Sequence, residues 1–330
     1  MIADAMRVIA IEEHFSTPMF REQVGANEFR NFYLTARSQQ LGHDIVREMA
    51  DLGEGRIRQM DAAGIDVQVL SFGSPGPQAF DAAVGVPMAR DANDRLYDAM
   101  GRHRGRFEGF AALATADPQA AAAELERTVK QYGFKGAMIH GCQQGRFLDE
   151  KTYWPLWQQA EALEVPIYLH PALPAPAALK AYFEGYEDLA RAGWGFAVDT
   201  SIHFLRLVFA GVFDAYPRLK IILGHLGEGL PFAMHRLNEH TWAAARRRGL
   251  RKQPIEYVRD NLAVTVSGNW FEPAFVCTLL ALGADNILFA ADWPYEANKT
   301  AMEFLRGISV SEQDRAKIAH LNAERVLRIA

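Results

Sequence analysis

The sequence predicts an α/β protein whose parallel strands close into a (β/α)8 barrel, the TIM barrel. Short runs of β-branched and aromatic residues recur along the chain, and a helical pattern lies between most of them. Such continuous apolar runs are typical of parallel strands that are buried on both faces. Eight of them in a chain of 330 residues favour a closed barrel over an open sheet. The predicted strands cover residues 8–11, 67–72, 107–113, 136–140, 166–170, 220–224, 262–267 and 287–291.

Helices are predicted in the connections between these strands. Asp117 and Pro118 mark the start of one helix, because Asp caps a helix N-terminus and Pro suits its first position. The alternation of strand and helix requires right-handed crossovers and a parallel sheet. The helical patterns cover residues 89–102, 118–132, 153–163 and 198–215.

Three segments do not follow the repeat, namely residues about 15–60, 171–194 and 228–260. Their Gly, Pro and aromatic content predicts insertions at the mouth of the barrel, on its carboxyl-terminal face. Insertions of this kind suit lids and subunit contacts more than a separate domain. Since the chain has no internal repeat or low-complexity linker, residues 1–330 are predicted to form a single barrel domain.

Composition excludes several classes of protein. With 49% hydrophobic and 23% charged residues, the chain can bury a large core and is not disordered, collagenous or a coiled coil. A formal charge of -5 gives no positive surface for a phosphate backbone, so we expect no nucleic-acid partner. No apolar run approaches the roughly 20 residues of a membrane helix, and the first residues lack a signal-peptide pattern. Two isolated cysteines, Cys142 and Cys277, fit a cytoplasmic location.

Four predicted strands have histidine or carboxylate side chains at their carboxyl ends. Glu12 and His14 follow the first strand, His170 ends the fifth, His225 follows the sixth and Asp292 follows the eighth. In TIM barrels the active site lies at this end of the strands. Because these residues come from distant parts of the chain, one shared site explains their placement better than independent accidents do.

A divalent metal ion is the predicted occupant of this site. Glu12 and His14 are two positions apart on an extended segment, so their side chains point to the same side, here inward. Imidazole and carboxylate ligands suit Zn²⁺ or Mn²⁺. Taken singly, each residue has an alternative: Glu12 in a solvated loop, His14 or His170 in the core, Asp292 capping a turn. His225 could bind the ion, hold a proton or bond to a backbone carbonyl, and we favour a catalytic role beside the metal.

Several motifs in combination resemble those of the non-oxidative decarboxylases of the amidohydrolase superfamily. They are Glu-x-His on the first strand, Tyr-Leu-His-Pro at residues 168–171, Gly-His-Leu-Gly-Glu-Gly-Leu-Pro at 224–231 and Asp-Trp-Pro at 292–294. The resemblance covers nearly the whole chain and is closest to the γ-resorcylate (2,6-dihydroxybenzoate) and 5-carboxyvanillate decarboxylase branches. It implies an amidohydrolase-like TIM barrel.

One departure from the superfamily pattern bears on the number of metal ions. Typical hydrolases of the superfamily have His-x-His on the first strand and often a bridging lysine after the fourth. In this chain Glu12 replaces the first histidine, and no lysine follows residues 136–140. The resemblance therefore implies one divalent ion, Zn²⁺ or Mn²⁺, and argues against a binuclear hydrolase.

The resemblance also implies a role for each residue of the site. Asp292 would be the catalytic acid, and His225 with Glu228 would return its proton after each cycle. The implied metal ligands are Glu12, His14, His170 and Asp292.

Three further residues are predicted to bind the substrate. Arg236 matches a substrate-binding arginine of the family, the alternative being an ion pair with Glu239. Phe15 suits a flat aromatic ring, although a place in the core is the alternative. Arg56 lies in a predicted helix over residues 51–63, which could instead expose it or offer it to a neighbouring subunit.

The implied reaction is loss of CO₂ from a small aromatic carboxylic acid with an ortho hydroxyl, after protonation of the ring carbon that bears the carboxylate. His14 fits the γ-resorcylate branch, whereas residues 141–150 look closer to the carboxyvanillate branch, so the ring substitution stays open. Relatives in the family are homodimers or homotetramers, and the same is expected here. The alternatives are a metal-dependent hydrolase of a lactone or other cyclic carboxylate in the same superfamily, and a metal-binding barrel without catalysis.

Overall fold

Parallel strands form the centre of the structure, a computed structural model that describes residues 6–25 and 27–330. The described residues form nine strands, which correspond to the eight predicted ones. The count differs because the third predicted strand, over residues 107–113, is divided in two at Phe110. All strand pairs run parallel. The strands are β1 (Ile9–Phe15), β2 (Val67–Phe72), β3 (Phe107–Gly109), β4 (Ala111–Ala112), β5 (Ala137–His140), β6 (Ile167–His170), β7 (Ile221–Leu223), β8 (Leu262–Thr265) and β9 (Ile287–Leu288).

The strands close into a barrel. One sheet has the order β1-β2-β3, and the other runs in sequence from β4 to β9. The backbone N–H of Phe110, between β3 and β4, donates to the carbonyl of Leu70 (2.9 Å) and so joins the two sheets. At the other seam, the N–H of Ile11 in β1 donates to the carbonyl of Phe289, just after β9 (3.2 Å). The predicted TIM barrel is confirmed.

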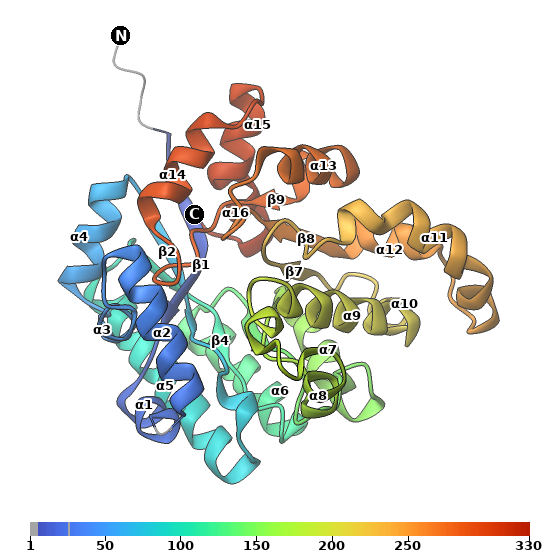
Figure 1. Ribbon diagram of the computed structural model, residues 1–330, viewed down its shortest axis with the longest axis horizontal. Coiled ribbons are helices and arrows are strands. Elements are labelled where there is room, and N and C mark those ends of the chain that lie inside the picture. The colour runs from blue at the N-terminus through green and yellow to red at the C-terminus, as the bar shows by residue number, and fades with distance from the viewer. Residues whose placement is uncertain (1–5, 26) are drawn as a thin grey trace.

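Helices surround the strands on all sides (Figure 1). The helix start at Asp117 lies where the sequence places it, since the Asp117 carboxylate accepts a hydrogen bond from the backbone of Ala120 (3.0 Å) and the helix begins at Pro118. The helices are α1 (Pro18–Val24), α2 (Glu28–Leu41), α3 (Ile45–Ala50), α4 (Glu54–Ala63), α5 (Ala82–Arg102), α6 (Pro118–Arg127), α7 (Trp154–Leu163), α8 (Pro176–Phe183), α9 (Gly195–Phe209), α10 (Val212–Ala215), α11 (Leu230–Arg247), α12 (Pro254–Asn261), α13 (Glu272–Leu282), α14 (Asn298–Gly307), α15 (Glu312–Ala316) and α16 (Asn322–Leu327).

Apolar side chains fill one end of the barrel interior. Side chains alternate across each strand, so one set faces the interior and the other faces the helices. Ile9, Ile11, Val69 and Leu288 belong to a buried interior cluster that α16 closes with Leu327. A larger cluster lies between the strands and the surrounding helices. The apolar base leaves the carboxyl-terminal end of the interior for polar side chains.

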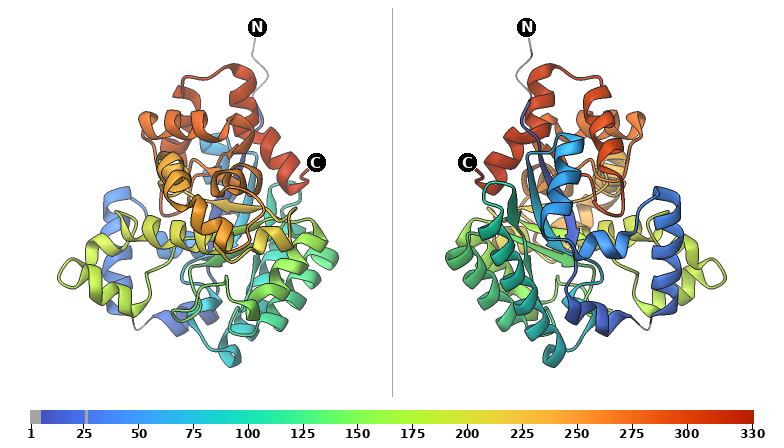
Figure 2. Two further views of the ribbon diagram at one scale, coloured as in Figure 1. Left: turned by 90° about the vertical axis from the view of Figure 1, so that its right-hand side faces the viewer. Right: turned by 90° about the vertical axis from the view of Figure 1, so that its left-hand side faces the viewer.

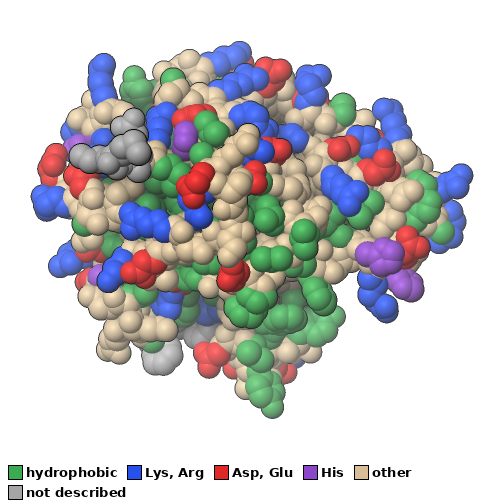
Figure 3. All heavy atoms as spheres, turned by 90° about the horizontal axis from the view of Figure 1, so that it is seen from above, with side chains coloured by type: hydrophobic (Ala, Val, Ile, Leu, Met, Phe, Trp, Pro, Cys, Tyr) green, Lys and Arg blue, Asp and Glu red, His purple; other side chains and the backbone are tan. Residues whose placement is uncertain are grey.

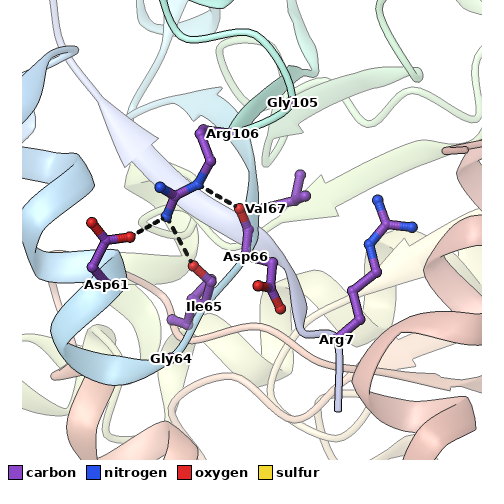
Figure 4. A pocket seen from close by; sticks show the side chains of 8 residues that line it. All are labelled: Arg7, Asp61, Gly64, Ile65, Asp66, Val67, Gly105 and Arg106. Carbon is purple, nitrogen blue, oxygen red and sulfur yellow. Dashed lines mark hydrogen bonds and ion pairs between the residues drawn. The ribbon is translucent and has the colours of Figure 1, made fainter. Parts of the chain in front are cut away.

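The opposite, amino-terminal end of the first strands carries a pocket of about 570 Å³ (Figure 4). Arg106 crosses this pocket, and its guanidinium donates to the Asp61 carboxylate (2.7 Å) and to the carbonyl of Asp66 (2.8 Å). The carboxylate of Asp66 accepts from the backbone N–H of Val8 (2.7 Å). These interactions hold the starts of β1, β2 and β3 together, on the side of a TIM barrel that serves stability rather than catalysis.

Two of the irregular segments meet at one edge of the molecule (Figure 2). Residues 15–60 form α1, α2, α3 and most of α4, and residues 171–194 form α8 and the short 3-10 helix η4 (Glu187–Ala190). The guanidinium of Arg191, which follows η4, lies over the ring of Tyr33 in α2 at 4.6 Å. The third segment, residues 228–260, holds α11 and α12, which pack against each other, and α11 also packs against α13.

None of the helices in the described part of the chain is both long and apolar enough to cross a membrane. The prediction that the chain starts without a signal peptide falls partly on residues 1–5, which lie outside the described residues. Cys142 and Cys277 are both unpaired.

A buried histidine predicts a loss of stability in acid. His203 on α9 is fully buried, and its Nε2 accepts a hydrogen bond from the backbone N–H of Leu148 (3.0 Å). Burial lowers the pKa of His203 to about 3, whereas an unfolded histidine titrates near pH 6.5. A pKa that folding lowers contributes stability above the unfolded value, and that stability is lost as the pH falls toward the folded value. The loss should reach about 1.4 kcal/mol per pH unit below pH 6.5.

The variant His203→Gln keeps a hydrogen-bond acceptor but has no titrating ring. We expect its free energy of unfolding, measured by denaturant titration between pH 7 and about pH 4, to fall less steeply than that of the wild type. His240→Gln, an exposed position on α11, is the matched control. Parallel curves for His203→Gln and the wild type would contradict the prediction.

Candidate functional site

Four side chains from three parts of the chain converge at the carboxyl-terminal end of the barrel. Glu12 and His14 come from β1, His170 ends β6, and Asp292 follows β9. One potential ligand atom from each lies within 4.8 Å of the others. Glu12 and His14 are fully buried, and the Asp292 side chain is 13% exposed. The barrel thus brings the four predicted ligands into one small cluster.

A bulge in β1 directs Glu12 and His14 into the barrel. Ile9 and Ile11 face the interior, and strict alternation would turn Glu12 and His14 toward the helices. The register of β1 against β2 shifts between Ala10 and Glu13, which inserts one extra residue into β1. Bulges are common next to active sites because they change the direction of a side chain. Because of the bulge, the apolar side chains of Ile9 and Ile11 are followed in the barrel interior by the polar side chains of Glu12 and His14.

The unpaired atoms in this cluster fit a cation. Glu12 Oε1, His14 Nε2 and Asp292 Oδ1 are buried and have no hydrogen-bond partner. His14 Nε2 lies 3.1 Å from Asp292 Oδ1, and His170 Nε2 lies 3.5 Å from Glu12 Oε1. Leaving several buried polar atoms unpaired costs free energy, which a divalent ion among them would offset. Two imidazoles and two carboxylates form a donor set suited to one such ion.

The outer ring nitrogens of both histidines are already bonded, which directs Nε2 of each toward the cluster. His14 Nδ1 lies 3.1 Å from Ser71 Oγ. His170 Nδ1 lies 2.7 Å from the carbonyl of Pro171 and 3.0 Å from His140 Nδ1. Such partners fix the tautomer of a metal-binding histidine. Burial lowers the pKa of His170 well below its usual value and that of His140 to about 3, so both rings are neutral.

The structure adds Ser71 and His140, which sequence reasoning did not single out. Both lie inside predicted strands, over residues 67–72 and 136–140, near the carboxyl ends that supply the other site residues. A polar residue at the end of an otherwise apolar strand is the signal that could have found them. His140 Nε2 also lies 2.7 Å from the carbonyl of Phe72, which ties β5 to β2 across the site.

Hydroxyl groups bind the second oxygen of the Glu12 carboxylate, Oε2. Its Oε2 accepts hydrogen bonds from Ser267 and from Thr265 (3.2 Å). The Tyr168 hydroxyl in turn lies 3.0 Å from Thr265 Oγ1. Burial raises the pKa of Glu12 above its usual value, and the attraction of His225 opposes this rise without cancelling it. A cation beside Oε1 would reverse that penalty.

Asp292 links the cluster to a second group, His225 and Glu228. His225 Nε2 lies 3.7 Å from Asp292 Oδ2, and its Nδ1 lies 2.7 Å from Glu228 Oε1. All three residues have left-handed backbone conformations, with φ of 52° for His225, 55° for Glu228 and 66° for Asp292. Such conformations are rare for residues other than glycine and often occur at functional sites.

Electrostatics place the proton of this group on His225. Burial opposes the charged imidazolium, but the carboxylates of Glu228 and Glu12 outweigh it and raise the pKa of His225 well above its usual value. Burial would also favour neutral Asp292, but the nearby imidazoles of His14 and His225 outweigh it and lower its pKa. These two shifts favour an imidazolium at His225 beside a carboxylate at Asp292.

The three predicted substrate contacts lie in different surroundings. Phe15 is 1% exposed and packs against Phe72 with ring centroids 5.5 Å apart. Arg56 is also 1% exposed, and its guanidinium donates to the carbonyls of His14 (2.6 Å) and Glu48 (3.2 Å). Arg236 is exposed on α11 and forms no ion pair with a described residue. Their contact with a substrate stays a prediction.

Comparisons with known proteins agree with this geometry. The amidohydrolase family model matches residues 30–329. A γ-resorcylate decarboxylase from Polaromonas sp. (strain JS666) is 38% identical, over 97% of this chain and 98% of that protein.

Two similar solved structures contain ligands. One is a 2,6-dihydroxybenzoate decarboxylase complexed with 2,6-dihydroxybenzoate (TM-score 0.90, 35% identity, 98% of this chain and 100% of the other). The other is a mutant 5-carboxyvanillate decarboxylase from Novosphingobium aromaticivorans with bound manganese and a nitrobenzoic acid (TM-score 0.89, 33% identity, 98% and 97%). The resemblance to non-oxidative decarboxylases that the motifs indicated is confirmed, and the chain belongs to the amidohydrolase family.

Proposed function

We propose that the protein is a metal-dependent, non-oxidative decarboxylase of an aromatic acid with a hydroxyl group ortho to the carboxylate, as in γ-resorcylate. The observation that carries this proposal is the position of Asp292, which belongs both to the four-residue cluster and to the proton-holding group with His225 and Glu228. A lone metal cluster would support hydrolysis equally well. Protonation of a substrate ring also requires a group beside the cluster that holds a proton and can deliver it.

The proposed metal ligands are Glu12, His14, His170 and Asp292, which would hold one divalent ion, Mn²⁺ or Zn²⁺. The ion would supply positive charge that stabilises a phenolate and a carboxylate oxygen of the substrate and fixes the orientation of the ring. The relatives named for dihydroxybenzoate and carboxyvanillate support an aromatic carboxylic acid as the substrate, and a bound manganese in one of them supports Mn²⁺.

The chain's own residues supply the proton. Direct loss of CO₂ from a benzoate would leave an aryl carbanion that the ring cannot delocalise. When the ring carbon first gains a proton, the carbon–carboxylate bond breaks, CO₂ leaves and the ring regains aromaticity. We assign Asp292 as the group that delivers this proton, His225 as the group that supplies it to Asp292, and Glu228 as the carboxylate that stabilises the imidazolium. A proton from solvent restores His225 after each turnover.

We assign roles in substrate binding to Phe15, Arg56 and Arg236. Of these, only Arg236 would contact the substrate directly. Phe15 and Arg56 are both buried, which supports indirect roles: Phe15 packs against Phe72, and Arg56 holds the carbonyl of His14. Arg236 is the candidate for a direct charged contact with a distal hydroxyl or carboxylate.

A panel of hydroxybenzoates tests the function. The purified, metal-loaded protein is incubated with 2,6-dihydroxybenzoate, 2,3-dihydroxybenzoate, 5-carboxyvanillate and benzoate, and ring absorbance is followed together with released CO₂. We expect one CO₂ per substrate consumed for at least one ortho-hydroxy acid and none for benzoate, which lacks the hydroxyl. Opening of a lactone without CO₂ release would show a hydrolase instead, and metal binding without turnover of any compound would show a non-catalytic barrel.

A methyl group at Gly268 is expected to disturb His225. A Cβ at this position would lie 3.1 Å from Cδ2 of His225, and the backbone φ of +61° adds strain. We expect Gly268→Ala to lower kcat by about tenfold, because the displaced imidazole no longer meets Asp292. Metal content should be unchanged.

The matched control for this variant is Gly249→Ala. Its φ of +85° imposes a similar backbone strain, but a Cβ there meets no atom within 4 Å. If both variants lose the same activity, backbone strain rather than displacement of His225 is the cause.

A homodimer or homotetramer is proposed from the surface of the second insertion. Large hydrophobic side chains gather at the lower edge of the face in Figure 3, around a pocket of about 700 Å³ formed by α8, η4 and α9. Tyr182 is 78% exposed, Tyr186 71% and Trp194 64%. Exposed apolar patches of this kind typically mark protein interfaces. Light scattering of the purified protein would show a single-chain mass if this proposal is wrong.

The remaining assignments concern the chain as a whole. Residues 1–330 are proposed to form one barrel domain, with insertions over about 15–60, 171–194 and 228–260, and contacts between the first two segments support this. Two unpaired cysteines support a cytoplasmic location.

A further inference from the structure

Glu13 lies between two proposed metal ligands but faces away from them. It is fully buried, and its carboxylate is directed toward the chain that follows β9. Glu13 Oε1 accepts a hydrogen bond from the backbone N–H of Ala291 (2.8 Å), and Oε2 accepts one from the backbone N–H of Trp293 (3.1 Å). These two residues flank Asp292. One carboxylate therefore holds the peptide groups on both sides of the proposed proton donor.

The backbone at Asp292 needs such support. Its φ of +66° lies in the left-handed region, which L-residues adopt only where the surroundings hold them. The ladder of β9 ends at Leu288, before this segment begins. Beyond it, the N–H of His14 donates to the carbonyl of Trp293 (2.6 Å), and Glu13 supplies the two acceptors described above. The Glu13 side chain thus does what strand pairing would do in a longer β9.

A buried network connects Glu13 to the other side of the site. Gln68 Nε2 donates to Glu13 Oε2 (3.4 Å), and Arg56 Nη1 donates to Gln68 Oε1 (3.3 Å). Arg56 also donates to the carbonyl of His14 (2.6 Å). Burial raises the pKa of Glu13 to about 8, and the positive charge of Arg56 partly opposes this rise. The same network therefore places the backbone of both His14 and Asp292.

We propose that Glu13 is a positioning residue that sets the place of the Asp292 carboxylate and, through it, the transfer of the proton to the substrate ring. The kinetic part of this inference rests on the proposed function, whereas its structural part does not. Glu13 holds the backbone beside Asp292 and not the substrate, so its loss should slow proton transfer more than it weakens substrate binding.

The variant Glu13→Gln tests this role. The amide has the shape of the carboxylate, but its nitrogen cannot accept a hydrogen bond, so one of the two N–H groups loses its partner. At full metal content we expect kcat to fall by about 10- to 100-fold with KM changed by less than about threefold, and the pH profile of kcat to shift. Amide hydrogen exchange over residues 289–297 should become about tenfold faster, as loss of one such bond predicts.

Glu303→Gln is the matched control, an exposed glutamate on α14 whose contact with Lys299 is long (3.9 Å). It should leave both measurements at wild-type values. The inference is overturned if Glu13→Gln shows wild-type kcat per bound metal and wild-type exchange, even when its melting temperature is lower. Should Glu13→Gln fail to fold, Glu13→Asp shortens the side chain by one methylene group, so that it cannot reach both N–H groups; wild-type exchange and kcat in that variant overturn the inference as well.

Failure of the proposed function has a different outcome. In that case the wild type releases no CO₂ from any hydroxybenzoate. Hydrogen exchange over residues 289–297 and metal affinity, measured by titration with Mn²⁺ alone, then decide the role of Glu13. Faster exchange and weaker Mn²⁺ binding in Glu13→Gln would support it, and unchanged values would overturn it.

Discussion

Replacement of Asp292 by Asn is expected to lower kcat for decarboxylation by at least 100-fold, the usual effect of losing a catalytic acid. Asparagine cannot take a proton from His225, whose Nε2 lies 3.7 Å from Asp292 Oδ2, and cannot pass one to the ring. The amide oxygen can still face the cluster, so we expect some bound metal to remain. Single-turnover CO₂ release and metal analysis of the same preparation provide the measurement.

Asp285→Asn is the control for this substitution. Asp285 lies in the short helix η5 (Ala284–Asn286), at the opposite end of β9 from Asp292, and pairs with Lys317 (3.0 Å) on the surface. Its activity should equal that of the wild type. A near-normal turnover by metal-loaded Asp292→Asn would remove Asp292 from the proton-delivery role and leave His225 as the direct donor.

Removal of the metal is expected to abolish decarboxylation completely and to lower the melting temperature by roughly 5–10 °C. Without a cation, the buried carboxylates of Glu12 and Asp292 face each other with unpaired oxygens, which destabilises the folded chain. Dialysis against a chelator followed by addition of Mn²⁺ or Zn²⁺ measures both effects. The ion that restores the higher kcat at equal occupancy identifies the better cofactor.

The variant Glu12→Gln separates loss of the metal from a general effect of the chelator. It replaces an oxygen of a proposed ligand by a neutral amide group, so we expect weak metal retention, little activity and a melting temperature that the chelator no longer changes. Glu22→Gln, on the exposed side of α1, should respond to the chelator as the wild type does. Full turnover in protein with less than about one tenth of an ion per chain would refute the metal requirement.

Much of the fold could be predicted because buried parallel strands leave a strong local pattern. Runs such as residues 287–291 are apolar at every position, so they stand out against the amphipathic helices between the strands. The division of the third strand at Phe110 was not predicted, because it depends on which neighbour accepts each backbone hydrogen bond. The same holds for the bulge at β1, since an extra residue in one strand exists only relative to its partner.

The four-residue cluster could be predicted from residue type and strand position, since Glu12, His170 and Asp292 lie at the ends of runs that must meet in a barrel. Ser71 and His140 were missed because a single polar residue inside an apolar run looks the same whether it faces the site or the helices. Arg56 shows the opposite difficulty. Its charge suggested a surface or a substrate, but burial gives it the backbone of His14 and Glu48 as partners.

The sequence by itself determined that the chain forms a closed barrel of parallel strands and which side chains meet at its carboxyl-terminal end. These properties follow from hydrophobic pattern and chain order, which are local. Only the tertiary structure showed that the pKa of His225 is raised and that of Asp292 lowered, because both shifts result from distances between groups far apart in the chain. The tertiary structure also showed that Glu13 accepts hydrogen bonds from the backbone beside Asp292. The sequence could not predict this contact, because the residues next to Glu13 do not indicate a partner so far along the chain.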